Sequence, residues 1–431
     1  MQTQTAAFQP VPMRPVAARC PVGASRPGRS SDPRAPRAAA FGRRLRSSLF
    51  ALAGLVLAAC GTTGSDTSAN LPPPSAVPAP VPVAPQFARI GLVLPLSGRT
   101  AEIGQALQDA AELALFDLSA RDVEILPADA GASAATAVGA TQNVLGGGAG
   151  IVIGPFGATS VKAAGGEARR RGTSMLGFTT DRTAAGGGVY LMGFLPEEQV
   201  SAIVAHATEA GMKRFAAIIP SGAYGDVVAA AFDVAVSAQG GYVVAAERYR
   251  SGSLQPNENL RALVTPGPDG RMPVDAIFVP EGGAALRQVT STLAGLGFDP
   301  HQVRLLGTDQ WSGSDLGSDP LTLGAWYAGP PPARFERFAS HFASTYGHRP
   351  PRIAAQAYDA TVLAVMLSRR PGGFTGARAA LESPDGFAGV DGLFRFRPDG
   401  TPQHGLAILE VTAIGPQVIR PAPETFSGQG F

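Results

Sequence analysis

Hydrophobic residues make up 45% of this 431-residue chain, which is enough for a sizeable core. The net charge is +2, but residues 1–59 hold nine arginines and one aspartate, so the remainder carries 26 basic and 32 acidic residues. That acidic remainder gives no basis for nucleic-acid binding, which depends on a basic surface. With two cysteines in all, the sequence also excludes a disulfide framework and a cysteine-based metal site.

An export signal is predicted at the end of residues 1–59. Arg43, Arg44 and Arg46 precede an apolar run from Leu49 to Ala59, and small residues close that run. As a helix the run would extend roughly 16 Å, about half of a bilayer's hydrocarbon core, so it is too short to span a membrane. A charged segment, a short apolar segment and a small-residue exit are typical of a cleaved signal. A buried core helix is the alternative, and it fits poorly between proline-rich flanks.

Residues 60–86 are predicted to form a linker. They end in "LPPPSAVPAPVPVAPQ", which contains seven prolines. Proline fixes φ and favours extended polyproline II at about 3 Å per residue. The linker could therefore hold a folded domain up to about 75 Å from a membrane.

From Phe87 to about Thr412, short apolar runs alternate with longer amphipathic runs. This alternation predicts parallel sheets covered by helices on both faces, and about 325 residues exceed one core, so we expect two α/β lobes. The predicted strands are 87–96, 123–129, 150–155, 174–178, 214–220, 242–249, 274–280 and 303–309. The predicted helices are 101–118, 133–145, 158–171, 197–210, 225–239 and 284–296.

Polar residues follow several of these strands. "LSG" with Ser97 follows the first, "FGATS" follows the third, and "FTTD" follows the fourth. Ligands of open α/β sheets bind beyond the carboxyl ends of the strands, where helix N-termini offer free backbone N–H groups to an anion. Ordinary turn and capping chemistry explains each residue equally well when it is taken alone. Their convergence at one sheet edge favours a ligand site.

Five segments along the chain carry a family resemblance. In order they are "IGLVLPLSGRTAEIGQALQDAAELAL", "IVIGPFGATS", "FAAIIPSGAYGDVVAAAF", "FDPHQVRLLGTDQW" and "PPRIAAQAYDATVLA". This order resembles the type I periplasmic-binding-protein family, and is most similar to leucine- and branched-chain-amino-acid-binding proteins. The resemblance implies an α/β fold of two Rossmann-like lobes joined by three crossovers, with an interlobe cleft.

The resemblance also implies lobe boundaries and crossovers. We expect a first lobe of residues 87–194 plus 325–388, a second lobe of residues 195–309 plus 396–420, and a tail of residues 421–431. The crossovers are expected near residues 194–197, 309–325 and 388–396.

Residue roles follow from the same resemblance. The carboxylate of an amino-acid-like ligand would meet Ala158, Thr159 and Thr179, beside Ser97. Tyr224 in "AYGD" would close over the ligand, and Asp309 in "GTDQW" would pair with its amino group. There are two departures from the family pattern. Ala158 replaces a hydroxyl residue, and Asp181 places a negative charge near the carboxylate site.

No catalytic motif accompanies this pattern. A phosphate-binding loop needs a lysine after glycine, and neither Lys162 nor Lys213 follows one. Gly-x-Ser-x-Gly and His-Glu-x-x-His are both absent from the sequence. The five histidines are scattered and show no metal-ligand spacing. We therefore expect no enzymatic activity, no cofactor and no metal.

Two functions stay open. Leu57–Cys60 resembles the lipobox of bacterial lipoproteins, which implies lipidation of Cys60, and Gly61 after it implies sorting to the outer membrane, facing the periplasm, in a Gram-negative cell. The whole chain is most similar to penicillin-binding-protein activators, lipoproteins that stimulate a peptidoglycan synthase. The segments that carry this similarity are "LPLSGRTAEIGQAL", "EGGAALR" and "GFAGVDGLFRFRPDG". The alternative is a substrate-binding lipoprotein that delivers an amino acid to an ABC permease, on the cell membrane if the organism is Gram-positive.

Overall fold

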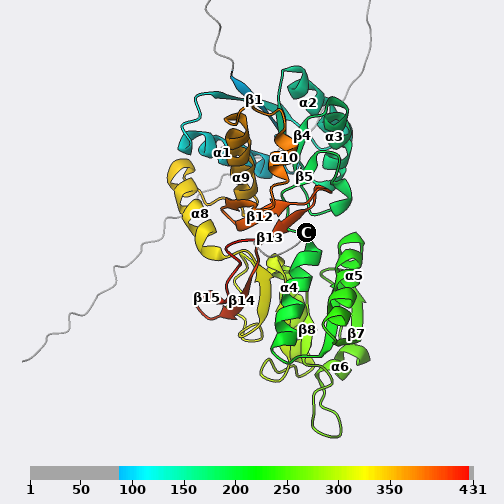
Figure 1. The fold of residues 1–431 in the computed structure, drawn as a ribbon. Helices are drawn as coiled ribbons and strands as arrows, with labels where there is room; N and C mark the ends of the chain where they lie inside the picture. The colour runs from blue at the N-terminus through cyan, green and yellow to red at the C-terminus, as the bar shows by residue number, and fades with distance from the viewer. Residues whose placement is uncertain (1–86, 427–431) are drawn as a thin grey trace, which may run out of the picture. The chain divides into compact units, whose positions relative to one another are not determined.

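The computed structural model describes residues 87–426 (Figure 1). Among these residues no helix has both the length and the apolar character needed to cross a membrane. The predicted signal in residues 1–59, the lipidated Cys60, the linker and the last five residues of the tail lie outside the described residues and stay predictions.

The first sheet has five parallel strands in the order β2-β1-β3-β4-β5. They are β1 (Ala88–Leu94), β2 (Val123–Asp129), β3 (Ile151–Phe156), β4 (Ser174–Phe178) and β5 (Val189–Leu191). Helices α1 (Ala101–Asp117), α2 (Ala134–Gly146) and α3 (Ala158–Arg171) connect the first four strands.

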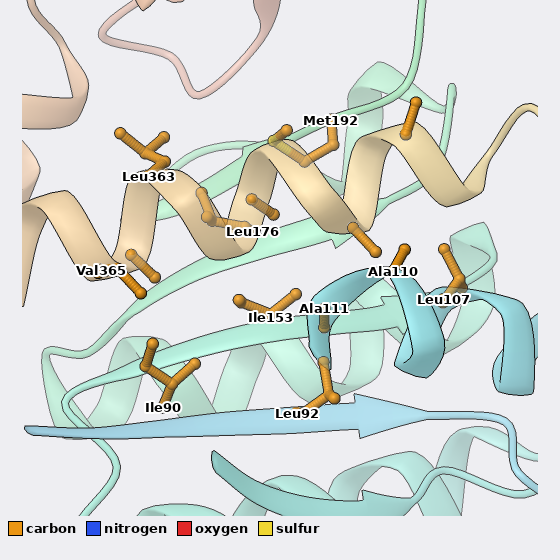
Figure 2. Packing of buried hydrophobic residues seen from close by; sticks show 14 of the residues in the cluster. Ile90, Leu92, Leu107, Ala110, Ala111, Ile153, Leu176, Met192, Leu363 and Val365 are labelled. Carbon is orange, nitrogen blue, oxygen red and sulfur yellow. The ribbon is translucent and has the colours of Figure 1, made fainter. Parts of the chain in front are cut away.

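Both faces of the first sheet are buried. Alternate strand residues such as Ile90 and Leu92 point to α1 and to the later helix α9 (Ala354–Ser368), as Figure 2 shows. Val93 and Val152 point the opposite way and pack against α2 and α3. This burial explains why the inner strands β3 and β4 are apolar runs without hydrophilic alternation, whereas the edge strand β2 is partly exposed and carries acidic residues.

The second sheet has seven strands in the order β15-β14-β10-β9-β8-β6-β7, and the two β14 pairings are antiparallel. The strands are β6 (Arg214–Pro220), β7 (Tyr242–Tyr249), β8 (Ala276–Phe278), β9 (Arg304–Gly307), β10 (Trp326–Gly329), β14 (Ala407–Thr412) and β15 (Gly415–Arg420). One face packs against α4 (Pro196–Glu209) and α5 (Ala223–Ala238), and the other against α6 (Glu258–Val264) and α7 (Gly283–Gly295).

A third, antiparallel sheet lies at the first lobe. It has the order β11-β12-β13, with β11 (Phe387–Gly389), β12 (Gly392–Phe396) and β13 (Pro402–His404). Phe394 and Phe396 of β12 join the core of the first sheet. Helices α8 (Pro332–Tyr346), α9 and α10 (Ala377–Leu381) contribute to the same core.

The structure confirms the predicted α/β fold with two lobes, but it moves two crossovers. The chain passes from the first lobe to the second between β5 and α4, and it returns to the first lobe between β10 and α8. It passes to the second lobe again between β13 and β14. The expected crossovers near 309–325 and 388–396 are therefore corrected. Residues 326–329 belong to the second sheet because β10 pairs with β9 and β14, and residues 402–404 belong with β12 in the third sheet.

Candidate functional site

The predicted site residues of the first lobe lie at one sheet edge. Ser97 follows β1, Ala158 and Thr159 begin α3 directly after β3, and Thr179 follows β4. Because β1, β3 and β4 are parallel neighbours, their carboxyl ends share this edge. The structure thus brings these four residues to one side of the first sheet, as the sequence predicts for a ligand site.

Ser97 holds a turn at this edge. The hydrogen bond between the Ser97 hydroxyl and the Asp129 carboxylate is the main reason why the pKa of Asp129 is below the ordinary value of an aspartate. The Gly131 N–H, which also donates to Asp129, is the second. The Leu96 N–H also donates to Asp129 Oδ1, at 2.9 Å. Ser97 therefore ties the end of β1 to the end of β2, which is the turn-forming role that the sequence analysis left open.

The N-terminus of α3 is open to an acceptor. Gly157 precedes it with a φ of 89°, and no side chain caps the helix. Ser133 caps α2 and Asn257 caps α6, whereas α1, α5 and α7 lack a side-chain cap as α3 does. Uncapped backbone N–H groups at a helix start, with the positive end of the helix dipole, favour an anion.

The sequence suggested that Asp181 places a negative charge at this edge, and the structure pairs that charge with a lysine. Lys162, in the first turns of α3, places Nζ 2.6 Å from Asp181 Oδ2. Burial would raise the pKa of Asp181, but bonds from Lys162 and Thr183 hold that pKa below its ordinary value. The Asp181 N–H donates to Thr179 Oγ1 at 3.1 Å. Lys162 thus offsets the repulsion that Asp181 would exert on a carboxylate.

In the second lobe, Tyr224 stands at the start of α5. Its hydroxyl donates to the Pro280 carbonyl beyond β8, at 3.2 Å, and burial raises its pKa to about 12. Gly225 allows this position, because a Cβ there would lie 1.7 Å from the Pro220 carbonyl oxygen. The glycine of "AYGD" therefore lets the first turn of α5 sit directly on the end of β6.

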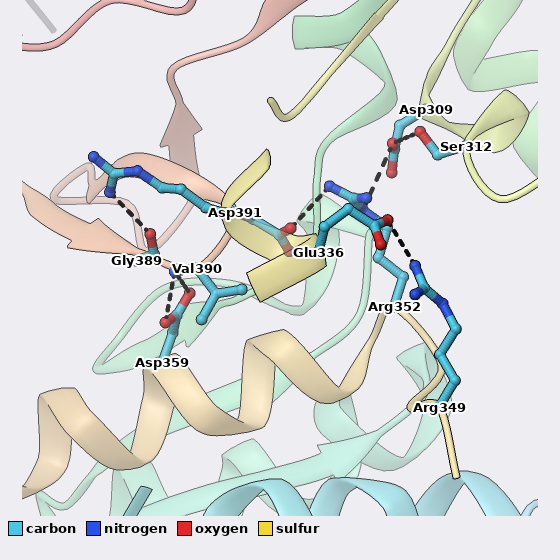
Figure 3. Close-up of polar contacts among 10 residues, drawn as sticks. Asp309, Ser312, Glu336, Arg349, Arg352, Asp359, Gly389, Val390 and Asp391 are labelled. Carbon is cyan, nitrogen blue, oxygen red and sulfur yellow. Dashed lines mark hydrogen bonds and ion pairs between the residues drawn. The ribbon is translucent and has the colours of Figure 1, made fainter. Parts of the chain in front are cut away.

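Asp309 follows β9 on the same edge of the second sheet and has polar neighbours from three other parts of the chain. Its N–H donates to Gln199 Oε1 at 2.7 Å, and the Ser312 hydroxyl donates to Asp309 Oδ1 at 2.5 Å. Arg352 Nε lies 3.9 Å from the same oxygen (Figure 3). Burial raises the pKa of Asp309 to about 6, against the opposing effect of Arg352.

Arg352 links the two lobes at this point. It lies just before α9, and its Nη2 donates to Asp391 Oδ1 in the β11–β12 turn at 2.9 Å. Its guanidinium also lies over Phe335, 4.7 Å from the ring centroid. The chain thereby supplies its own cation beside Asp309, where the family resemblance places the amino group of a ligand.

Sequence reasoning missed Arg352, Gln199, Ser312 and Asp391. One signal was present within "PPRIAAQAYDATVLA", where Arg352, Gln356 and Asp359 recur at helical spacing in an otherwise apolar run. Nothing local marks the others, since the fold alone brings them to Asp309. Within residues 87–426, no cluster of three or more histidine, cysteine, aspartate or glutamate side chains is placed to hold a metal ion.

Comparisons with known proteins agree with this architecture. A family model described as a periplasmic binding protein matches residues 88–416. No curated protein matches the chain in sequence.

Solved structures share the fold. A protein from Rhodospirillum rubrum described as a branched-chain amino acid ABC transporter is 23% identical, with a TM-score of 0.69 over 77% of this chain and 100% of that chain. A solute binding protein of an ABC transporter from Rhodopseudomonas palustris, in complex with 3,4-dihydroxybenzoic acid, is 18% identical, with a TM-score of 0.59 over 78% and 97%. A branched-chain amino acid transporter substrate binding protein from Streptococcus pneumoniae, in complex with isoleucine, is 20% identical, with a TM-score of 0.57 over 78% and 100%.

Proposed function

The chain belongs to the periplasmic binding protein family, and we propose that it is a non-catalytic protein whose interlobe cleft binds a small carboxylate for delivery to an ABC permease. The observation that carries this proposal is the N-terminus of α3, which has no side-chain cap and lies beside the Lys162–Asp181 ion pair at the carboxyl ends of β3 and β4. Family membership implies export to the periplasm. Lipidation at Cys60 belongs to the proposal, whereas attachment to the outer membrane belongs to the second candidate function below.

The ligand chemistry follows from both sides of the cleft. On the first lobe, the N-terminus of α3 offers N–H groups to an anion, and the Lys162–Asp181 ion pair beside it cancels the charge of Asp181. On the second lobe, the Ser312 hydroxyl donates to Asp309, and the Arg352 guanidinium places a positive charge 3.9 Å away without a hydrogen bond, so a cation already stands beside this carboxyl group. Isoleucine and 3,4-dihydroxybenzoic acid are the ligands of two similar structures. Both carry a carboxylate, but only isoleucine carries an ammonium group. We therefore favour a carboxylate without an amino group.

Calorimetry tests this proposal. Benzoate, 4-hydroxybenzoate, leucine and isoleucine are titrated into the mature chain and into Lys162→Ala. Removing Lys162 leaves the charge of Asp181 without its partner beside the ligand carboxylate, which should cost about 1–2 kcal/mol, or roughly 5- to 30-fold in affinity. Lys213→Ala is the matched control, because Lys213 is the only other lysine and precedes β6, away from the cleft edge. Equal affinities of the two variants for every acid would contradict the assigned site.

A second candidate is a penicillin-binding-protein activator. The internal pairing of Asp309 with Arg352 supports it, since a protein that binds another protein has no need for an acid free to accept an amino acid. The resemblance of "GFAGVDGLFRFRPDG" to that subgroup supports it as well. Its test is peptidoglycan synthesis by a penicillin-binding protein with and without the mature chain. Stimulation at stoichiometric protein, joined with no calorimetric heat for any acid, would favour the activator over the transporter.

A further inference from the structure

The ion pairs that join the two lobes near the crossovers are sorted by charge. Within residues 87–426, three arginine–carboxylate pairs cross from one lobe to the other. In each of them the first lobe supplies the arginine and the second lobe supplies the carboxylate. The pairs are Arg182–Glu197, Arg397–Glu198 and Arg352–Asp309, with N···O distances of 3.6, 3.0 and 3.9 Å. Opposite charges on facing surfaces attract them and fix how they meet, so we call these three pairs the hinge clamp.

The first turn of α4 builds the acidic side of the hinge clamp. Helix α4 begins at Pro196, directly after the first crossover, so Glu197 and Glu198 lie where the chain enters the second lobe. The next residue, Gln199, is buried, and its Oε1 accepts the Asp309 N–H at 2.7 Å. Three consecutive side chains of one helical turn therefore carry or hold all three carboxylates.

The basic side of the hinge clamp comes from three separate segments of the first lobe. Arg182 lies between β4 and β5, Arg352 lies just before α9, and Arg397 follows β12. Arg352 Nη2 donates to Asp391 Oδ1 at 2.9 Å (Figure 3), and Arg397 Nη1 donates to the Pro402 carbonyl at 2.6 Å. The first lobe thus positions two of the three arginines by itself, independently of their partners across the crossovers.

Glu198 is the centre of the hinge clamp. Its side chain is 16% exposed, and besides the pair with Arg397 its Oε2 accepts the His404 N–H at 3.2 Å, again from the first lobe. The His404 ring stacks on Phe194 in the first crossover, with centroids 4.0 Å apart. Exposed ion pairs contribute little and are screened by salt, whereas partly buried pairs are screened much less. We therefore expect Glu198 to contribute more to the clamp than the pair of the exposed Arg182.

We propose that the hinge clamp holds the two lobes in the orientation of this structure when the cleft is empty. Domains joined by short crossovers and a modest polar interface move relative to one another by default, so a fixed orientation needs specific contacts. A clamped pair of lobes presents an already formed cleft and an already formed surface, which lowers the ordering cost of binding a ligand or a protein. The clamp needs the two-lobed fold but none of the ligand chemistry proposed above.

A local explanation for the two glutamates predicts a different outcome. Acidic side chains in the first turn of a helix interact favourably with its dipole, so Glu197 and Glu198 would stabilise α4 alone. That explanation does not account for the arginine opposite each glutamate, nor for Asp309, which lies outside α4. It predicts that neutralising Glu198 lowers stability and leaves the lobe orientation unchanged.

Distances between spin labels on the two lobes test the proposal. The mature chain with Cys60→Ala has no native cysteine, and Ser340→Cys on α8 and Ser237→Cys on α5 place one exposed label on each lobe. Without any ligand, pulsed electron paramagnetic resonance should give one narrow distance distribution. A broad distribution would overturn the proposal, and this measurement leaves every residue of the clamp intact.

Two variants assign the orientation to the hinge clamp. Glu198→Gln removes the central charge with little change of shape, and we expect the fraction of chains at the main distance to fall at least twofold. Arg397→Gln removes the same pair from the other lobe and should have the same effect, so the test stands even if one of the two variants folds poorly. An unaltered distribution in both variants would overturn the proposal.

Glu209→Gln is the matched control. Glu209 ends the same helix, α4, and pairs with Arg420 at 2.7 Å, but both residues belong to the second lobe. Breaking this pair should leave the distance distribution as it is in the wild type. A change as large as that of Glu198→Gln would show that any lost charge on α4 moves the lobes, which would contradict a role of the cross-lobe pairs.

Discussion

Replacing Asp359 by asparagine should stabilise the protein at neutral and alkaline pH. Asp359 is buried on α9, and the Val390 N–H donates to both its carboxylate oxygens at 2.9 Å, which holds the β11–β12 turn. Burial raises the pKa of Asp359 from 3.8 to about 8. An acid with a raised pKa in the folded state keeps a proton that the unfolded chain releases. The free energy of unfolding therefore falls as pH rises from about 4 to about 8.

The size of the effect follows from that interval. The full difference between the two pKa values sets an upper limit of roughly 5 kcal/mol at pH 8. Asparagine keeps an acceptor for the Val390 N–H and never ionises, so we expect Asp359→Asn to gain about 2–4 kcal/mol at pH 8 and close to nothing at pH 4. Asp385→Asn, an exposed residue in the loop before β11, is the control and should have no such effect.

The assay is urea unfolding of the wild type and both variants at several values between pH 4 and pH 8. The difference between Asp359→Asn and the wild type should grow steadily with pH. A constant difference across this range, or a variant less stable than the wild type at pH 8, would refute the assignment of a buried, protonated carboxyl group at this position.

Three further predictions concern other parts of the chain. Arg352→Gln should raise the pKa of Asp309 above about 6, because the guanidinium opposes the effect of burial; a carboxyl NMR titration measures it, and an unchanged or lowered pKa would contradict the pairing. Gly389→Ala should destabilise the fold by roughly 1–3 kcal/mol in urea unfolding, since its Cβ would lie 2.3 Å from Asp359 Oδ2; a stability equal to the wild type would contradict this packing. Cys60→Ala should abolish lipidation, and mass spectrometry of the wild type showing an unmodified mature N-terminus would refute the lipoprotein prediction.

The parts of the fold that the sequence predicts well are those with local signals. Helix α3 was predicted at 158–171 and spans Ala158–Arg171, because Gly157 before it and Gly172 after it adopt positive φ and mark both ends. The strands 174–178, 214–220 and 242–249 also coincide with β4, β6 and β7, since continuous apolar or alternating runs bounded by turns have a clear period.

The remaining elements lack such signals. Strands β5 and β8 have three residues each, too few to establish a period, and the sequence analysis missed β5 and made β8 longer than it is. The crossover after β10 was misplaced because the pairing of β10 with β9 and β14 depends on residues distant in the chain.

The candidate site divides in the same way. Ser97, Thr159 and Thr179 could be placed at one sheet edge, because strand order and turn residues suffice for that inference. The partner of Asp309 could not be inferred, since Arg352 reaches it only after the chain has returned to the first lobe. The sequence thus sufficed to place these residues at one sheet edge, while the charges around Asp309 needed the structure.

The most direct test of the proposed function compares isoleucine with 3-methylpentanoate, the same carboxylate without its amino group, by calorimetry on the mature chain. Because Arg352 already stands beside Asp309 while the N-terminus of α3 has no side-chain cap, 3-methylpentanoate should bind at least as tightly as isoleucine. Isoleucine binding tenfold or more tightly than 3-methylpentanoate, or heat from neither ligand, would contradict a cleft built for a carboxylate without an ammonium group.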